Sequence, residues 1–197
     1  ALAMTMRIAR ALDNADASEH DKLLVRVGTA VGKYWICKRT PAHAYEAMEC
    51  IGGSGVMEDC IMPRLFRESP VNSIWEGSGN VQCLDMLRAM SRSPGSVDAF
   101  MTEAQSAAGA DRRLDAYVAQ LGVELTDRSD IEYRARGVVE KMALALQGAL
   151  LVRHGNAAVA DAFCASRLGG NSSGLTFGNL PRGVDCAAII ERATPRL

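Results

Sequence analysis

Apolar residues recur at three- and four-residue steps through the first fifty positions, which is the pattern of amphipathic helices. Residues 1–12 resemble the end of a helix, and residues 13–20 are polar and rich in capping side chains, which indicates a loop. The next helical face is formed by Leu24, Val27, Val31, Tyr34 and Trp35. We expect this helix to pause at Pro41, resume to about Ile51 and stop at Gly52.

Residues 52–79 differ from the rest of the chain. They contain five glycines and two prolines among alternating apolar and charged positions, which predicts an irregular, extended stretch in which binding groups concentrate. Helical periodicity returns in residues 81–90, and residues 91–96 have the composition of a linker. We therefore expect a subdomain of residues 1–92 followed by a helical extension of residues 97–197.

The extension repeats the helical pattern. A glycine- and serine-rich tail is expected over residues 169–181. Helices are expected over residues 97–121, with a weak point at Gly109, and over residues 131–153, 157–168 and 185–192. Short loops between such helices favour antiparallel packing, so the predicted fold class is an all-α, up-down helical bundle.

The composition indicates a soluble globular protein. Of 197 residues, 48% are hydrophobic and only 5% aromatic, and abundant Ala and Leu favour helices over a β-sandwich. The net charge of -1 gives no overall attraction to nucleic acid or anionic membranes. No apolar run approaches the roughly 20 residues that span a bilayer. The chain starts without Met and already in helical pattern, so we expect it to be a piece of a longer protein.

The cysteines do not predict a metal site or a disulfide framework. No C-x-x-C pair and no His at zinc-ligand spacing occurs. Scattered cysteines in a chain of this size are typical of buried, reduced thiols in a cytoplasmic protein. They are Cys37, Cys50, Cys60, Cys83, Cys164 and Cys186.

One carboxylate in the irregular stretch has two possible roles. Glu76 lies between Trp75 and Gly77, just before the small residues Ser78, Gly79 and Asn80 that lead into a helix. Burial would raise its pKa and make it a proton acceptor near neutral pH, beside a backbone anion site. On the residues alone a purely structural role is favoured, in which Glu76 caps the helix that starts near Gly79, because acidic side chains favour the first turn of a helix.

Two motifs in residues 44–90 resolve this ambiguity by resemblance. AMECIGGSGV ends one helix, and PRLFRESPVNSIWEGSGN follows it closely. In this order and without gaps, they resemble the C-terminal helical domain of the acyl-CoA dehydrogenase family, and most closely its AidB-like branch. The resemblance implies an FAD-dependent oxidoreductase acting on an acyl-CoA thioester, within a homo-oligomer that is a tetramer by family habit.

The resemblance assigns roles to individual residues. Glu76 falls at the position of the catalytic base, which removes the α-proton of the thioester while the β-hydride passes to the flavin. The substrate-binding positions are Trp75 and Gly77, and the cofactor-binding positions are Ser78, Gly79, Asn80, Glu49 and Gly53. The last two match a segment that reaches the FAD of a neighbouring subunit, where glycine permits close backbone approach.

Three residues depart from the family pattern. Glu49 replaces a Gln, Trp75 replaces a Tyr, and Asn80 is one methylene shorter than the usual Gln. The bulk of Trp75 favours a short or altered acyl group, and an ionised Glu49 cannot donate the hydrogen bond of an amide. The same departures occur in the AidB-like branch, which is linked to DNA protection with weak dehydrogenase activity.

This branch makes DNA-binding protection the alternative function, although charge gives it little support. From Asp98 onward the chain has 11 basic and 12 acidic residues. DNA binding would therefore need arginines gathered by the fold, namely Arg112, Arg113, Arg134, Arg136 and Arg182. A third hypothesis is a plain helical assembly module. Because the family's N-terminal helical and middle β-domains are missing from this sequence, we expect the chain alone to be inactive and to bind FAD poorly.

Overall fold

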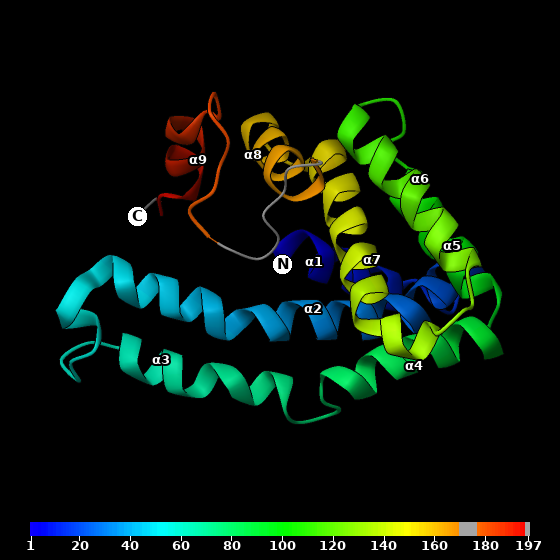
Figure 1. Ribbon diagram of the computed structural model, residues 1–197, viewed down its shortest axis with the longest axis horizontal. Helices are drawn as coiled ribbons and strands as arrows, with labels where there is room; N and C mark the ends of the chain where they lie inside the picture. The colour runs from blue at the N-terminus through cyan, green and yellow to red at the C-terminus, as the bar shows by residue number, and fades with distance from the viewer. Residues whose placement is uncertain (170–176, 196–197) are drawn as a thin grey trace.

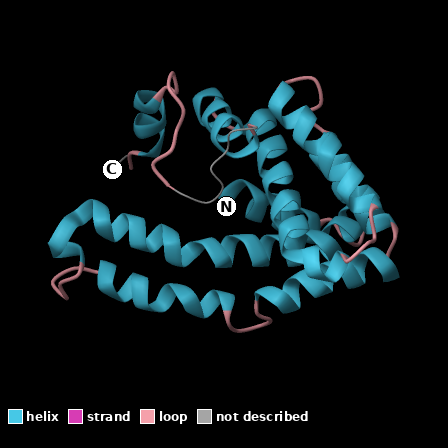
Figure 2. Ribbon diagram, in the orientation of Figure 1, coloured by secondary structure: helices cyan, strands magenta, loops and turns pink. Residues whose placement is uncertain are grey.

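The computed structural model describes residues 1–169 and 177–195, which form helices joined by loops and contain no strand (Figures 1 and 2). The predicted all-α class is confirmed. The α-helices are α1 (Leu2–Asp13), α2 (Glu19–Ile51), α3 (Met62–Glu68), α4 (Gly79–Arg92), α5 (Gly95–Gln105), α6 (Arg112–Thr126), α7 (Ile131–His154), α8 (Ala157–Phe163) and α9 (Cys186–Ala193).

Helix α2 is the longest element and organises the fold (Figure 1). Ser18 caps its start by accepting a hydrogen bond from the Asp21 amide, and it ends at Gly52, whose φ is 74°. The prediction of a pause at Pro41 is wrong, because α2 continues through this proline. The proline removes one backbone hydrogen bond, but packing against α1, α3, α4, α5 and α7 holds the helix on both sides of it.

The helix expected over residues 97–121 is two helices, and the weak point expected at Gly109 lies in the break between them. Helix α5 ends at Gln105, and Gly109 adopts a left-handed conformation with φ of 84° before α6 begins. Asp111 then caps α6 by accepting hydrogen bonds from the amides of Arg113 and Leu114. The left-handed glycine and the cap together end α5 and start α6, a break that the apolar periodicity alone does not show.

The last third of the chain follows its periodicity closely. Helix α7 matches the expected residues 131–153, and α9 matches the short helix expected at residues 185–192. Residues 157–168 begin as α8, capped by Asn156, and finish as the π-helical turn Cys164–Leu168. Of the tail expected over residues 169–181, residues 170–176 lie outside the described part.

One hydrophobic core has members from both predicted portions of the chain. A buried hydrogen bond of 3.1 Å joins Trp35 Nε1 on α2 to Gln147 Oε1 on α7. The division into residues 1–92 and 97–197 remains a prediction. The largest fully buried side chains are Phe100, Met4, Leu24, Met86, Leu114, Leu121, Met142 and Leu146.

The cysteines are free, as predicted, but not uniformly buried. Cys83 and Cys164 lie in the core, whereas Cys50, Cys60 and Cys186 are exposed, which corrects the expectation of buried thiols. Cys50 lies in the last turn of α2, Cys60 in the loop before α3, and Cys186 at the start of α9. Among the helices of the described residues, none combines the length and apolarity needed to cross a bilayer.

Asp111 is expected to make stability depend on pH in the acid range. Hydrogen bonding to Arg113, at 2.6 Å, outweighs burial and lowers the carboxyl pKa to about 2. Because the folded pKa lies below the unfolded one, the stabilisation is present above about pH 4 and is lost as pH falls towards 2. Asp111→Asn should lower the unfolding free energy at neutral pH by about 1–2 kcal/mol. In urea titrations at several pH values, the unfolding free energy of Asp111→Asn should also depend less on pH in the acid range. The control Asp16→Asn, at an exposed loop position, should change neither the unfolding free energy at neutral pH nor its dependence on pH.

Candidate functional site

The irregular stretch is partly helical rather than extended. It contains the 3₁₀ helix Gly52–Gly55, then α3, then a second 3₁₀ helix, Ser69–Ser73. Together these run back antiparallel to the far half of α2 and form a long hairpin with it (Figure 1). The hairpin positions the loop of residues 74–78 between Ser69–Ser73 and α4.

Glu76 occupies an unusual backbone conformation in this loop. Its φ is 52°, and that of the following Gly77 is 99°, so two consecutive residues are left-handed. This conformation is costly for a residue with a Cβ and tends to persist where surrounding contacts enforce it, often at functional sites. The side chain of Glu76 is exposed, so the described residues do not supply the burial on which the base hypothesis relied.

Two side chains hold the loop by its carbonyl oxygens. Lys33 Nζ donates to the carbonyls of Asn72 at 3.2 Å, Trp75 at 2.8 Å and Gly77 at 2.8 Å. Gln82 Nε2 donates to the carbonyls of Glu76 at 3.0 Å and Gly77 at 3.3 Å. We call Lys33 and Gln82 the loop clamp. Sequence reasoning missed both residues, because nothing in the local pattern links Lys33 to a loop some forty positions away.

The start of α4 leaves hydrogen-bond donors available beside the loop. Ser78 occupies the N-cap position, but no side chain caps the helix. The capping role considered for Glu76 is therefore not what the structure shows. Gly79 is buried, and a Cβ there would lie 3.4 Å from the ring of Tyr34 and from Lys38. Glycine thus lets α4 start tight against α2, and the first backbone N–H groups of α4 are donors that no side chain caps.

Asn80 is oriented by the extension. Arg136 Nε, on α7, donates to Asn80 Oδ1 at 2.7 Å. Because the oxygen is engaged, the amide NH₂ group of Asn80 is left to donate to a ligand. Arg136 was singled out in the sequence only as a candidate for DNA contact, and its link to Asn80 spans 56 positions, a pairing that no local pattern indicates.

The remaining predicted site residues lie far from the loop. Glu49 and Gly53 are exposed at the tip of the hairpin. Glu49 lies about 24 Å along α2 from Lys33, at a rise of roughly 1.5 Å per residue. A Cβ on Gly53 would meet nothing within 4 Å. The structure thus brings Trp75 to Asn80 together and leaves Glu49 and Gly53 at a second location.

The buried thiol next to this region is held in its protonated form. Burial raises the pKa of Cys83 to about 11, with only a small opposing effect from the charge of Arg136. Cys83 is therefore protonated near neutral pH, and the thiolate is the reactive form. Glu76 is left as the candidate base in the loop.

The arginines proposed for DNA contact are mostly engaged within the chain. Arg113 pairs with Asp111 and with Asp161, at 2.6 and 2.8 Å. Arg134 pairs with Asp127 at 3.2 Å. Pairing with carboxylates reduces the charge that these side chains offer to phosphates.

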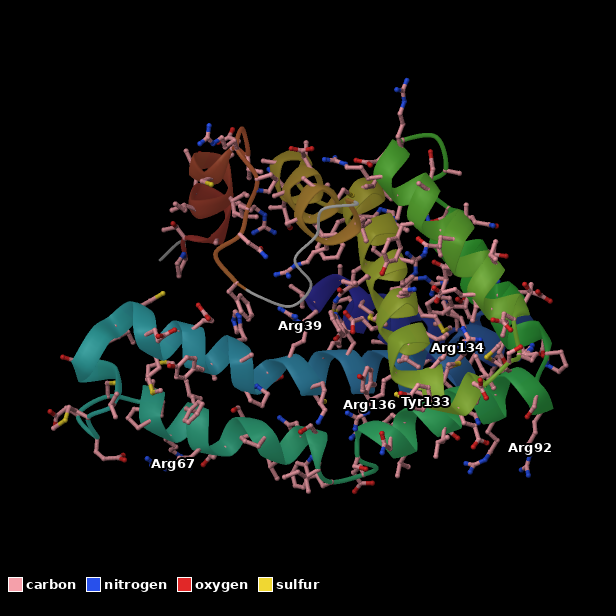
Figure 3. The ribbon with its side chains drawn as sticks, viewed as in Figure 1. Arg39, Arg67, Arg92, Tyr133, Arg134 and Arg136 are labelled. Atoms are coloured by element: carbon pink, nitrogen blue, oxygen red, sulfur yellow. The ribbon has the colours of Figure 1, made fainter. Side chains whose placement is uncertain are left out.

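These arginines are also not gathered in one place. Arg112 and Arg113 begin α6, whereas Arg134 and Arg136 lie in the first turns of α7. The two helices are antiparallel neighbours, so their starts lie about 20 Å apart. Figure 3 shows Tyr133, Arg134 and Arg136 together at the end of α7 that lies over α4.

Comparison with known proteins finds similar proteins in one family. The family model described as "Acyl-CoA dehydrogenase, C-terminal domain" matches residues 1–91. The chain is 40% identical over 163 residues to a putative acyl-CoA dehydrogenase, AidB, of Escherichia coli, covering 82% of this chain and 29% of AidB. It is 31% identical over 157 residues to acyl-CoA dehydrogenase family member 11 of Caenorhabditis elegans, covering 70% and 25%.

A solved structure shares the fold. The crystal structure of Caenorhabditis elegans ACDH-11 in complex with C11-CoA matches with a TM-score of 0.75 and 28% identity, over 85% of this chain and 33% of that one. The chain spans less than a third of the length of the curated relatives it matches. The predicted bundle, including part of the extension, therefore has a counterpart in solved proteins.

Proposed function

Because this chain belongs to the acyl-CoA dehydrogenase family, with the family's C-terminal domain in residues 1–91, we propose that it is part of an FAD-dependent flavoprotein that dehydrogenates a CoA thioester. The proposed base is Glu76, which takes the α-proton of the acyl group. The observation that carries the proposal is the left-handed Glu76, presented outward on a loop that Lys33 and Gln82 hold by its carbonyls.

The loop clamp supports a base role by fixing the backbone while leaving the carboxylate free. All five clamp hydrogen bonds go to backbone oxygens, so none occupies the Glu76 side chain. A base must lie within hydrogen-bond reach of the proton it takes, and a rigid backbone limits the positions of a short side chain.

The donors around α4 fit a flavin. The open N–H groups at the start of α4, the hydroxyl of Ser78 and the NH₂ group of Asn80 are all donors, and the edge of an isoalloxazine ring carries acceptors. When bound, FAD supplies the acceptor for the β-hydride. Ser78, Gly79 and Asn80 bind and orient the ring, while Trp75 and Gly77 contact the acyl group. Trp75 is 57% exposed and available for that contact.

We propose that the tip of the hairpin serves a second subunit. Glu49 and Gly53 lie too far from the Glu76 loop to act on the same flavin, and the surface between them is unusually apolar for exposed residues. This supports a homo-oligomer in which the tip reaches a neighbour's cofactor. The exposed apolar side chains along the hairpin include Tyr45, Ile51, Val56, Met57, Ile61, Leu65, Ile74 and Trp75.

The proposed function is tested on the full-length protein that contains this chain. Turnover is followed by reduction of an artificial electron acceptor with acyl-CoA substrates from short to long chains. We expect turnover with thioesters that carry both α- and β-hydrogens and none with an analogue lacking a β-hydrogen. Absence of turnover across the whole series, in protein that carries FAD, contradicts the proposal.

Lys33→Met is expected to reduce turnover without unfolding the protein. The substitution keeps the aliphatic stem but removes three hydrogen bonds to the loop, so Glu76 is no longer held in position. We expect kcat of the full-length protein to fall about 10–100-fold, since misplacement of a catalytic group by about 1 Å has effects of that size. Lys38→Met, on the same helix beside Gly79, is the matched control and should retain kcat. Equal losses of kcat in both variants would show that the hydrogen bonds from Lys33 to the loop are not what turnover depends on.

DNA binding is the second candidate function, favoured by one observation. Tyr133 is 93% exposed and adjoins Arg134 and Arg136 in the first turns of α7, an arrangement suited to stacking on an unpaired base. If this surface binds DNA, Tyr133→Ala should weaken the binding of single strands. Affinity should also fall steeply with salt. Binding that is absent or insensitive to salt excludes this function.

A further inference from the structure

One hydrogen bond joins the extension to the proposed flavin site. Arg136, in the second turn of α7, donates from Nε to Asn80 Oδ1 at the start of α4 over 2.7 Å. Figure 3 shows Arg136 at the end of α7 that lies over α4. This distance is typical of a hydrogen bond with a charged donor, which is roughly twice as strong as a neutral one.

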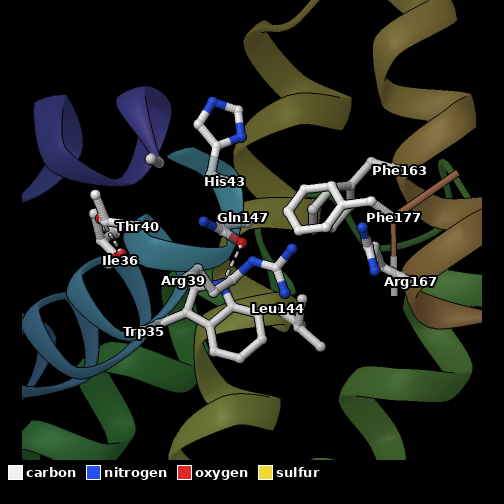
Figure 4. A pocket seen from close by; sticks show the side chains of 11 residues that line it. Trp35, Ile36, Arg39, Thr40, His43, Leu144, Gln147, Phe163, Arg167 and Phe177 are labelled. Carbon is white, nitrogen blue, oxygen red and sulfur yellow. Dashed lines mark hydrogen bonds between the residues drawn. The ribbon is translucent and has the colours of Figure 1, made fainter. Parts of the chain in front are cut away.

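Helix α2 fixes the positions of both helices that carry these side chains. The start of α4 lies against Tyr34, because a Cβ on Gly79 would be only 3.4 Å from its ring. Helix α7 is fixed by the buried hydrogen bond from Trp35 Nε1 to Gln147 Oε1, drawn in Figure 4. Tyr34 and Trp35 are consecutive residues of α2, so one short stretch of this helix sets α4 and α7 relative to each other.

Arg136 determines which way the amide of Asn80 points. A guanidinium group has five N–H donors and no acceptor, so the amide atom that faces it must be the oxygen. The NH₂ group of Asn80 is therefore turned away from Arg136 and remains a donor. Without this contact both amide orientations are open to an exposed asparagine, and one of them presents the oxygen to a ligand in place of the NH₂ group.

No competing carboxylate draws Arg136 away from Asn80. Within the described residues Arg136 forms no ion pair, whereas the nearby Arg134 pairs with Asp127 at 3.2 Å. Burial raises the pKa of Tyr34 and raises that of Cys83 to about 11, and the charge of Arg136 opposes both rises. The guanidinium group therefore lies close to α2 and α4, with Asn80 as its hydrogen-bond acceptor.

We propose that Arg136 is a positioning residue of the flavin site, which raises the reduction potential of the bound flavin by holding the Asn80 amide with its NH₂ group toward the ring. This inference rests on the proposed function, because it takes the ring to lie at Asn80. Reduction adds two electrons to the ring, so a donor that faces the ring binds the reduced form more tightly than the oxidised form. The extension is then a part of the cofactor site.

The reduction potential of the full-length protein with bound FAD tests this inference. It is measured without substrate, by equilibration with a reference dye in the absence of oxygen. Arg136→Met removes the donor, so we expect the ratio of the affinities for reduced and oxidised flavin to fall at least tenfold, which lowers the potential by about 30 mV. Arg153→Met removes the same charge from an exposed position of α7 about 25 Å away, at roughly 1.5 Å per residue, and should leave the potential unchanged.

Two further variants test the orientation of the amide. Lysine, like arginine, has donors and no acceptor, whereas glutamine carries an acceptor that can engage the NH₂ group of Asn80. Arg136→Lys should therefore retain most of the potential, and Arg136→Gln should lower it. Because Arg136 is exposed, these variants should fold, which thermal melting and FAD content check.

An Asn80→Ala background separates positioning from the effect of charge alone. If Arg136 acts through Asn80, Arg136→Met should lower the affinity ratio no more than threefold in this background. A tenfold fall in both backgrounds, equal potentials in the Lys and Gln variants, or an unchanged potential in Arg136→Met would each overturn the inference.

The potential is measured without turnover, so a failure of this inference differs from a failure of the proposed function. A wild-type protein that carries FAD but turns over no thioester would contradict the dehydrogenase, and the effect of Arg136→Met on the potential would still be measured. A full-length protein that binds no FAD would contradict both.

Discussion

Glu76→Gln in the full-length protein is expected to lower kcat about 10²–10⁴-fold, the usual contribution of a general base. Glutamine has nearly the same size and accepts the same left-handed backbone, and the loop clamp binds only main-chain oxygens. The loop should therefore keep its position, and FAD content and thermal stability should match wild type. The measurement is steady-state turnover of an acyl-CoA, with the flavin spectrum recorded in parallel.

The matched control is Glu68→Gln. Glu68 is an exposed carboxylate in the same hairpin, paired with Arg64 at 3.0 Å, and exposed ion pairs contribute little to stability. This variant should turn over at the wild-type rate. If both variants lose turnover to a similar extent, removal of any carboxylate from the hairpin lowers turnover, and Glu76 is not the base.

Phe100→Ala is expected to lower the unfolding free energy of the chain by about 3–5 kcal/mol. Phe100 lies on α5, is fully buried and belongs to a core shared with α2, α4, α6 and α7. Its removal leaves a cavity in that shared core. Because the core crosses the predicted boundary at residues 92–97, the loss should appear as an earlier single transition rather than as melting of the extension alone.

Urea unfolding followed by two probes checks this result. Fluorescence in a Trp75→Phe background reports on the buried Trp35 of α2, and far-ultraviolet circular dichroism reports on all helices. Both probes should shift together in Phe100→Ala. Val123→Ala, at a 70% exposed position of α6, should shift neither by more than about 0.5 kcal/mol. A Trp35 transition that stays in place would show that the two portions unfold independently.

Periodicity predicts the long elements of this protein well and their interruptions poorly. Helix α7 is buried along most of its length and α9 is strongly amphipathic, so their apolar spacing locates both. Pro41 misleads, because the packing of α2 compensates for one lost backbone hydrogen bond. Gly109 is the expected weak point of the helix over residues 97–121, and it lies in the break between α5 and α6, but the apolar spacing on either side does not show that the helix stops there.

The candidate site also has one part that the sequence predicts and another that it does not. Glu76 and its neighbours stand in one contiguous motif, so the sequence identifies them by resemblance. The partners that position them come from α2 and α7, and their contacts with the loop and Asn80 exist only after the helices pack. The exposure of Glu76 was not predictable either, because the burial of a side chain depends on which elements pack over its loop.

The most direct test of a base at Glu76 is the first half-reaction of the full-length protein. Oxidised wild-type protein and Glu76→Gln are each mixed with acyl-CoA in the absence of oxygen, and loss of the visible flavin absorbance is followed in time. Wild type should bleach rapidly, whereas Glu76→Gln should bind the thioester, seen as a spectral perturbation, and bleach at least a hundredfold more slowly. Bleaching of Glu76→Gln at the wild-type rate would contradict the assignment of Glu76 as the base.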